Sequence, residues 1–154
     1  MNQFMEAAIA EGRAGMRAGE GGPFGALIVR EGEIVARAHN EVLGTHDPTA
    51  HSEVLAIRRA SAALGRFDLS DCEIYSSCEP CPMCFAAIHW AKIRTLVFGC
   101  TKGDAARIGF DDEFIYEVIR GTARRAQVSV RQESREDALA LFGEWERMAS
   151  RRMY

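Results

Sequence analysis

Three potential metal ligands and one spare carboxylate follow one another in a set order in this sequence of 154 residues. His51 and Glu53 form an H-x-E motif, and Cys81 and Cys84 form a P-C-x-x-C motif further along the chain. One imidazole and two thiolates are three of the four ligands of a tetrahedral zinc ion, and a catalytic zinc site keeps the fourth position open for water. Glu53 is then left to accept and return the proton of that water. The pattern therefore predicts hydrolysis by a zinc-activated water.

Two predicted helices position these ligands. His51 opens a helical pattern that runs to Leu64, and Pro82 opens a second helix that runs to about Ala91. Helix N-termini carry partial positive charge and free amide groups, which favour a thiolate over a thiol. Cys81 and Cys84 lie three residues apart, so both can point at one ion. We expect the ligands to gather where the two helices begin.

The other cysteines leave alternatives open. Cys78 lies three residues before Cys81 and would make a closed, structural zinc site if it were a fourth ligand. The H-x-E motif and the prolines beside Cys81 favour the open, catalytic site. A thioredoxin-like redox pair would leave His51 and Glu53 unexplained. Five cysteines and no secretory signal argue against a disulfide framework, and Cys72 and Cys100 are expected to be inert core thiols.

Composition narrows the class of protein. The formal net charge is −3, and 47% of the residues are hydrophobic, which suits one domain with a substantial core. No stretch approaches the roughly 18–20 apolar residues of a membrane helix, and residues 1–11 lack the basic region of a signal peptide. A soluble, cytoplasmic protein without a membrane partner is expected. Neither half of the chain is strongly basic, so a nucleic-acid substrate is not expected.

Hydrophobic periodicity predicts an α/β fold. An amphipathic helix begins near Phe4, a capping-box-like pair at Ser134 and Asp137 begins the last helix, and strand-like runs lie between them. The predicted strands cover residues 24–30, 33–38, 73–77, 94–99 and 127–131. The first two form a hairpin, and the alternation that follows indicates a mixed sheet of about five strands with helices on both faces. The expected fold is a three-layer α-β-α domain covering residues 1–154.

At this point the chain resembles the cytidine deaminase superfamily, and within it the small bacterial zinc-dependent guanine deaminases. The resemblance is nearly full-length. It is carried by the segments Gly21–Ala26, Asp47–His51, Ser77–Cys84 and Gly109–Tyr116 and by the final residue, Tyr154. The zinc motif is common to the superfamily, whereas the G-F-D-D-x-F-I-Y segment and the final tyrosine point to guanine deaminase. The resemblance implies a cytidine-deaminase-like fold.

The resemblance also implies an activity, which is hydrolysis of guanine at C2 to xanthine and ammonia. His51, Cys81 and Cys84 would hold one zinc ion per chain, and Glu53 would be the main proton shuttle. The remaining site residues match family positions for proton transfer at the leaving amine (Asp112), hydrogen bonding to the purine (Asn40), stacking on it (Phe24) and proximity to the substrate (Trp90). Spacing alone is equally compatible with a turn-forming Asn40 and with Asp112 as a helix N-terminal acid.

Tyr154 matches a C-terminal tyrosine that reaches the active site of a partner subunit. The resemblance therefore implies a homodimer in which a C-terminal segment, about residues 120–154, is exchanged between protomers. Ser52 departs from the family, where alanine is frequent between the histidine and the glutamate. Three alternatives stay open: deamination of another heterocycle (an aminotriazine, guanosine or cytosine), tRNA adenosine deamination, and a zinc-stabilised structural module.

Overall fold

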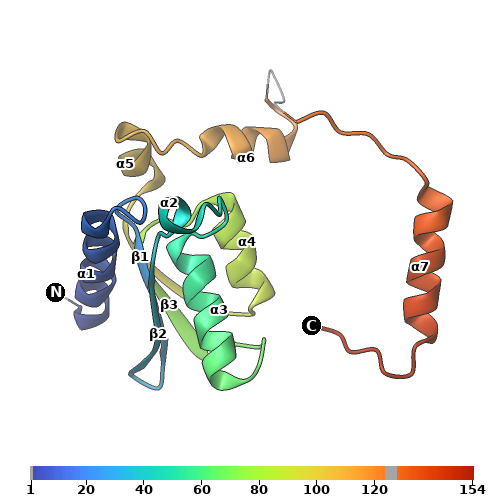
Figure 1. Cartoon of the computed structure of the whole chain (residues 1–154), viewed down its shortest axis with the longest axis horizontal. Helices are drawn as coiled ribbons and strands as arrows, with labels where there is room; N and C mark the ends of the chain where they lie inside the picture. Colours follow the sequence, from blue (N-terminus) through green and yellow to red (C-terminus); the bar gives the residue numbers. More distant parts are fainter. Residues whose placement is uncertain (1, 124–127) are drawn as a thin grey trace.

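A four-stranded mixed sheet lies between two layers of helices (Figure 1). The computed structural model describes residues 2–123 and 128–154. The strands are β1 (Gly25–Arg30), β2 (Glu33–His39), β3 (Cys72–Cys78) and β4 (Thr95–Cys100), in the order β2-β1-β3-β4. β1 is antiparallel to both β2 and β3, and β3 is parallel to β4. The predicted hairpin and the mixed character of the sheet are confirmed.

Helices flank both faces of this sheet. The helices of the described residues are α1 (Gln3–Ala18), α2 (Val42–Thr45), α3 (Ser52–Leu64), α4 (Pro82–Trp90), α5 (Lys102–Arg107), α6 (Glu113–Arg120) and α7 (Arg135–Arg147). Figure 1 shows α1 on one side of the sheet and α3 and α4 on the other, with α5 and α6 beyond the sheet edge. Within the described residues, no helix combines the length and the apolar character that crossing a membrane requires.

The central strand β1 is buried on both faces. Leu27 and Val29 pack with Ala8 of α1, whereas Ile28 packs in a second cluster that includes Ala56 of α3. Successive side chains of a strand point to opposite faces, so one strand contributes to both clusters. Fully burying a side chain of this size contributes about 1.5–3 kcal/mol to the free energy of unfolding. The three-layer α-β-α architecture is therefore confirmed, and two clusters stabilise it.

Two details of the sequence-based prediction are wrong. The fifth strand was expected over 127–131, but Val128–Arg131 forms no strand, and Gln127 lies outside the described residues. This segment lies away from the sheet edge (Figure 1), so among residues 2–123 and 128–154 its alternating valines have no neighbouring strand to pair with. Ser134 makes no side-chain capping bond at the start of α7; its backbone is left-handed (φ 51°, ψ 39°), whereas a capping residue is typically extended.

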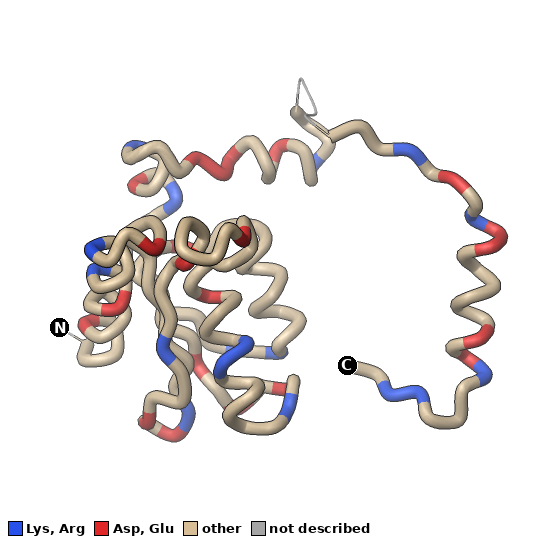
Figure 2. Tube along the Cα trace, in the orientation of Figure 1, with Lys and Arg blue, Asp and Glu red and all other residues tan. Residues whose placement is uncertain are grey.

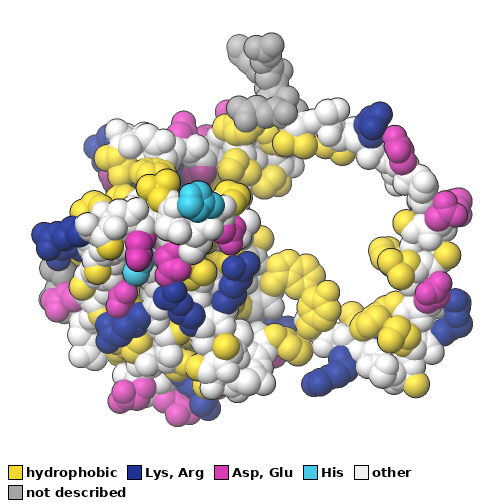
Figure 3. Space-filling model, viewed as in Figure 1, with side chains coloured by type: hydrophobic (Ala, Val, Ile, Leu, Met, Phe, Trp, Pro, Cys, Tyr) yellow, Lys and Arg dark blue, Asp and Glu magenta, His cyan; other side chains and the backbone are white. Residues whose placement is uncertain are grey.

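The C-terminal part of the chain extends away from the three layers. α7 stands apart from the sheet, and its apolar side chains, including Leu141 and Phe142, are 64% and 65% exposed. Figure 3 shows hydrophobic side chains along this arm, on both sides of an open space between the arm and the body. Within the described residues, α7 thus presents an apolar surface that the body of the chain leaves exposed.

The sheet topology gathers the sequence-predicted site at one edge. β2, β3 and β4 end at the same edge, since each of β2 and β3 is antiparallel to β1 and β4 is parallel to β3. α3 begins shortly after β2, and α4 begins shortly after β3. In α/β sheets, ligands bind outside the carboxyl ends of parallel strands.

Candidate active site

His51, Cys81 and Cys84 lie together at this edge. Their ligand atoms are within 4.8 Å of one another, and His51 Nδ1 is 3.5 Å from the sulfur atoms of both Cys81 and Cys84. Zinc bonds of about 2.3 Å to sulfur and 2.0–2.1 Å to nitrogen place tetrahedral nitrogen and sulfur ligands about 3.6 Å apart. The observed separations therefore fit a zinc ion bound by these three residues.

Backbone geometry frees these side chains for the site. His51 and Cys81 are the N-cap residues of α3 and α4, and neither makes a side-chain capping bond. Pro82 occupies the first turn of α4, where its missing N–H costs no helical hydrogen bond. The partially positive ends of both helices thus converge on the sulfur atoms.

Hydrogen bonds among the three side chains shift their pKa values. Hydrogen bonds from Cys84 and then from His51 lower the pKa of Cys81 to about 4. Donation to Cys81, together with burial, raises the pKa of Cys84. The hydrogen bond with Cys81 raises the pKa of His51. These hydrogen bonds favour a thiolate at Cys81, and a metal ion that binds here requires deprotonated cysteines and a neutral histidine.

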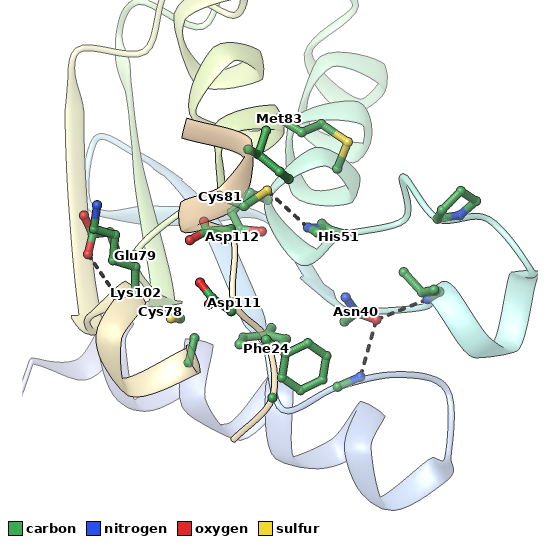
Figure 4. A pocket seen from close by; sticks show the side chains of 18 of the residues that line it. Phe24, Asn40, His51, Cys78, Glu79, Cys81, Met83, Lys102, Asp111 and Asp112 are labelled. Atoms are coloured by element: carbon green, nitrogen blue, oxygen red, sulfur yellow. Dashed lines mark hydrogen bonds between the residues drawn. The ribbon is translucent and has the colours of Figure 1, made fainter. Parts of the chain in front are cut away.

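Cys78 does not belong to this group of ligand atoms in the described part of the chain. Its thiol faces the carbonyl oxygen of Thr101 at 3.7 Å, and burial raises its pKa to about 11. Figure 4 shows Cys78 away from the facing side chains of His51 and Cys81. This placement leaves three protein ligands and argues against a closed structural site. Of the two other cysteines, Cys72 is buried as expected, but Cys100 is exposed.

A cavity of about 630 Å³ opens beside the cluster. Ligand pockets of roughly 300–1,000 Å³ suit small molecules. Glu53 lines this cavity and is only 6% exposed, so its carboxylate is held in a largely water-excluded place. The cavity brings together Phe24, Asn40, His51, Glu53, Cys81 and Asp112. Six residues predicted from sequence thus share one site.

The side-chain amide of Asn40 has a defined orientation. Its Oδ1 accepts hydrogen bonds from the backbone N–H groups of Gly22 (3.4 Å) and Val42 (3.2 Å). A Cβ at Gly21 would collide with the Asn40 side chain and carbonyl, so this close approach requires glycine. With its oxygen occupied, Asn40 presents Nδ2 to the cavity as a hydrogen-bond donor (Figure 4).

An aromatic pair lines the cavity. The rings of Phe24 and Phe110 have centroids 4.9 Å apart and stand at 87° to each other. An edge-to-face pair of this kind favours one ring orientation. Phe110 was not predicted as a site residue from sequence, because its neighbourhood with Phe24 joins segments 86 residues apart in the chain. Its signal was its place in the G-F-D-D segment.

Asp112 lies at the start of α6 and faces the cavity. Burial, followed by the nearby negative charge of Cys81, raises the pKa of Asp112. Lys102, a second residue missed from sequence, also lines the cavity, but its ammonium group pairs with Glu113 at 2.9 Å. The ammonium group is therefore neutralised by a carboxylate that does not line the cavity.

Trp90 and Tyr154 do not line the cavity of their own chain. Trp90 ends α4, whereas the metal ligands lie at the beginning of that helix. The ring centroids of Trp90 and Tyr154 lie 6.1 Å apart. Trp90 is 68% exposed and Tyr154 is 71% exposed. The structure thus brings these two predicted residues together, but away from the site.

Known proteins are similar to this chain in both sequence and structure. Residues 1–100 match the family model of the cytidine and deoxycytidylate deaminase zinc-binding region. The chain is 43% identical to the guanine deaminase of Bacillus subtilis strain 168 over 151 residues, covering 98% of this chain and 97% of the relative. The X-ray structure of Bacillus subtilis guanine deaminase superposes with a TM-score of 0.94, covering 100% of this chain and 99% of the other.

Two further relatives match over shorter stretches. A tRNA-specific adenosine deaminase of Aquifex aeolicus is 43% identical over 95 residues, 62% of each chain. A mutant protein solved in complex with 8-azaguanine is 33% identical, with a TM-score of 0.67, covering 77% of this chain and 71% of the other. With this family model, this full-length relative and this ligand set, the chain belongs to the zinc-binding cytidine and deoxycytidylate deaminase family.

Proposed function

We propose that this protein hydrolyses guanine to xanthine and ammonia, using one zinc ion per chain. The single observation that carries the choice of guanine is the match to a guanine deaminase over 98% of the chain. The zinc motif alone is common to deaminases of several substrates. A related protein with 8-azaguanine bound supports a purine in the cavity.

The chemistry proposed follows from the donor set. His51, Cys81 and Cys84 would hold zinc, which when bound would supply a water activated as a nucleophile at neutral pH. Glu53 takes a proton from the water and delivers it to the substrate. The oxygen bonds to C2 as one proton of the water passes to a ring nitrogen; the second proton of the water passes to the amino group, the C2–amino bond breaks, and ammonia leaves. Asp112 lines the same cavity and is placed to assist proton transfer at the leaving amine.

The cavity suits an uncharged base. Phe24 stacks on the purine, and Asn40 donates from Nδ2 to one of its acceptors. The carboxyl groups that line the cavity belong to Glu53, Glu79, Asp111 and Asp112. They repel a phosphate, and Lys102 is already paired with Glu113. A free base is therefore favoured over a nucleotide.

The direct test is incubation of the zinc-loaded protein with guanine while xanthine is followed by absorbance. Guanosine, cytosine and an aminotriazine form the comparison panel. We expect guanine to give the highest kcat/KM. If the fully loaded protein produces no xanthine, guanine is not the substrate.

A tRNA adenosine deaminase is the second candidate, since such enzymes are similar over about two thirds of the chain. Figure 2 shows acidic and basic residues interspersed along the trace, where RNA binding would favour a basic stripe. Salt-sensitive binding of a tRNA anticodon stem-loop, with inosine formed, would support this candidate instead.

Asn40→Asp is expected to raise KM for guanine by about 100-fold, which corresponds to about 2.7 kcal/mol. Aspartate retains an oxygen for the backbone N–H groups of Gly22 and Val42 but presents an acceptor where Asn40 presents a donor. Steady-state kinetics measures the change, and thermal unfolding checks that the fold is retained. An unchanged KM in a folded variant would show that Asn40 only shapes its own loop.

We also propose a homodimer in which a C-terminal segment, about residues 120–154, is exchanged between the two protomers; residues 124–127 of it lie outside the described residues. The apolar side chains of α7 are exposed, and the arm stands apart from its own sheet. A second copy with the complementary arm covers such a surface in a symmetric dimer. In this arrangement, Tyr154 contributes to substrate binding in the active site of the partner subunit.

Deletion of Tyr154 is expected to lower kcat/KM by at least about tenfold, while the unfolding temperature changes little, because an exposed terminal residue contributes little stability. Light scattering should give the mass of a dimer for both proteins. Tyr154→Phe is the matched variant, since it retains the ring and separates stacking from hydroxyl chemistry. Normal turnover by the truncated chain would contradict a site completed by the partner.

A further inference from the structure

Two buried serine hydroxyls hold the carboxylate of Glu53. Ser52 Oγ donates to Oε2 at 3.0 Å, and Ser76 Oγ donates to Oε1 at 2.9 Å. Ser52 and Ser76 are 0% and 1% exposed, and Glu53 is 6% exposed. Each oxygen of the carboxylate therefore accepts a hydrogen bond from a donor that water does not reach.

The two donors come from different elements. Ser52 is the first residue of α3, directly after His51, whereas Ser76 lies in β3. A serine hydroxyl has one proton to donate, and here both hydroxyls use it on Glu53. Two bonds from separate elements fix the carboxylate against rotation more firmly than either bond alone, because a single bond still allows it to pivot.

This restraint matters because of what Glu53 could otherwise do. Carboxylate oxygen is an ordinary zinc ligand, and Glu53 lies only two residues from His51. In the described part of the chain, Glu53 is not a member of the group of close ligand atoms formed by His51, Cys81 and Cys84. A freely rotating Glu53 could turn to the cation and occupy the position that hydrolysis requires for water.

We propose that Ser52 and Ser76 are positioning residues that keep Glu53 beside the metal site and prevent it from becoming a fourth ligand. The consequence for turnover rests on the proposed function, whereas the effect on metal coordination does not. The hydrogen bond to Glu53 is thus the physical role of the Ser52 hydroxyl, at the middle position of the H-x-E motif.

The kinetic arm of the test uses variants that differ by a hydroxyl. Ser76→Val removes the donor, and Ser76→Thr retains it in a side chain that has the shape of valine. Ser52→Ala removes the other donor. Loss of an outer hydrogen-bond partner of a metal ligand typically costs 10–100-fold in metal affinity or activity, and the lower end is taken for partners of a carboxylate beside the metal site. We expect Ser52→Ala and Ser76→Val each to lower kcat about tenfold with KM little changed, and Ser76→Thr to stay near the parent value. Ser61→Ala, on the same helix and outside the site, is the control.

The coordination arm replaces zinc with cobalt(II), whose visible absorption reports the number and geometry of its ligands. We expect the double variant Ser52→Ala/Ser76→Val to differ from the parent spectrum. Adding Glu53→Ala to the double variant should remove that difference. This arm needs no substrate, so it decides the inference even if guanine proves not to be turned over. The proposal is overturned if the folded double variant keeps the cobalt spectrum of the parent protein. It is also overturned if the parent protein is active and the double variant has the same kcat.

Discussion

Glu53→Gln is expected to retain zinc and to lower kcat for guanine by about 10³- to 10⁴-fold, the upper range for loss of general acid–base catalysis. Glutamine keeps the size of the side chain and an oxygen that can accept from Ser52 or Ser76, but it cannot carry a proton at neutral pH. Metal content by mass spectrometry and xanthine formation measure the two effects separately.

Glu79→Gln is the matched comparison, because Glu79 is a second carboxylate of the same cavity. Its Oε2 accepts a hydrogen bond from the backbone N–H of Lys102 at 2.9 Å, and the oxygen of glutamine can accept the same bond. The loss should therefore stay below about tenfold, well short of a general acid–base residue. Near-normal turnover by Glu53→Gln, or an equal loss in both variants, would show that proton transfer has been assigned to the wrong group.

Cys81→Ala is expected to abolish measurable turnover and to weaken zinc binding by more than about 100-fold, since even outer partners of metal ligands cost 10–100-fold. Cys81 is one of the two cysteine ligands; hydrogen bonds lower its pKa to about 4, and its sulfur atom lies 3.5 Å from His51 Nδ1. Zinc content after dialysis against a weak chelator, together with the rate of xanthine formation, measures the loss.

Cys78→Ala is the control for this variant, because both residues belong to one series of cysteines spaced three apart. The thiol of Cys78 faces Thr101 and lies outside the ligand group of the described residues, so its loss should leave zinc bound. If Cys78→Ala releases zinc as readily as Cys81→Ala, the centre has four protein ligands and is structural.

The sequence by itself determined the ligand set and the layers of the fold. His51, Cys81 and Cys84 stand at or near helix N-termini, and short-range signals such as Pro82 define where those helices begin. The three layers followed from periodicity, because a strand buried on both faces needs helices on both sides. These features depend on neighbours within a few residues, so they can be predicted without knowledge of the whole fold.

Only the tertiary structure decided which long-range neighbours complete the site. The direction of Cys78 depends on β4 lying beside β3, and the orientation of Asn40 depends on the loop at Gly22. The hydrogen bond between Ser76 and Glu53 joins a strand to a helix 23 residues earlier. None of these contacts leaves a periodic pattern in the sequence, because each joins single side chains of different elements.

The C-terminal region shows the same limit most clearly. Alternating valines at 128 and 130 predicted a strand, and Ser134 predicted a helix cap, but neither is formed. A strand requires a partner edge, and a cap requires an extended backbone at its residue, so local propensity could not decide either one. Sequence determined the chemistry that the residues can perform, whereas packing determined their orientation, because orientation depends on contacts between segments distant in the chain.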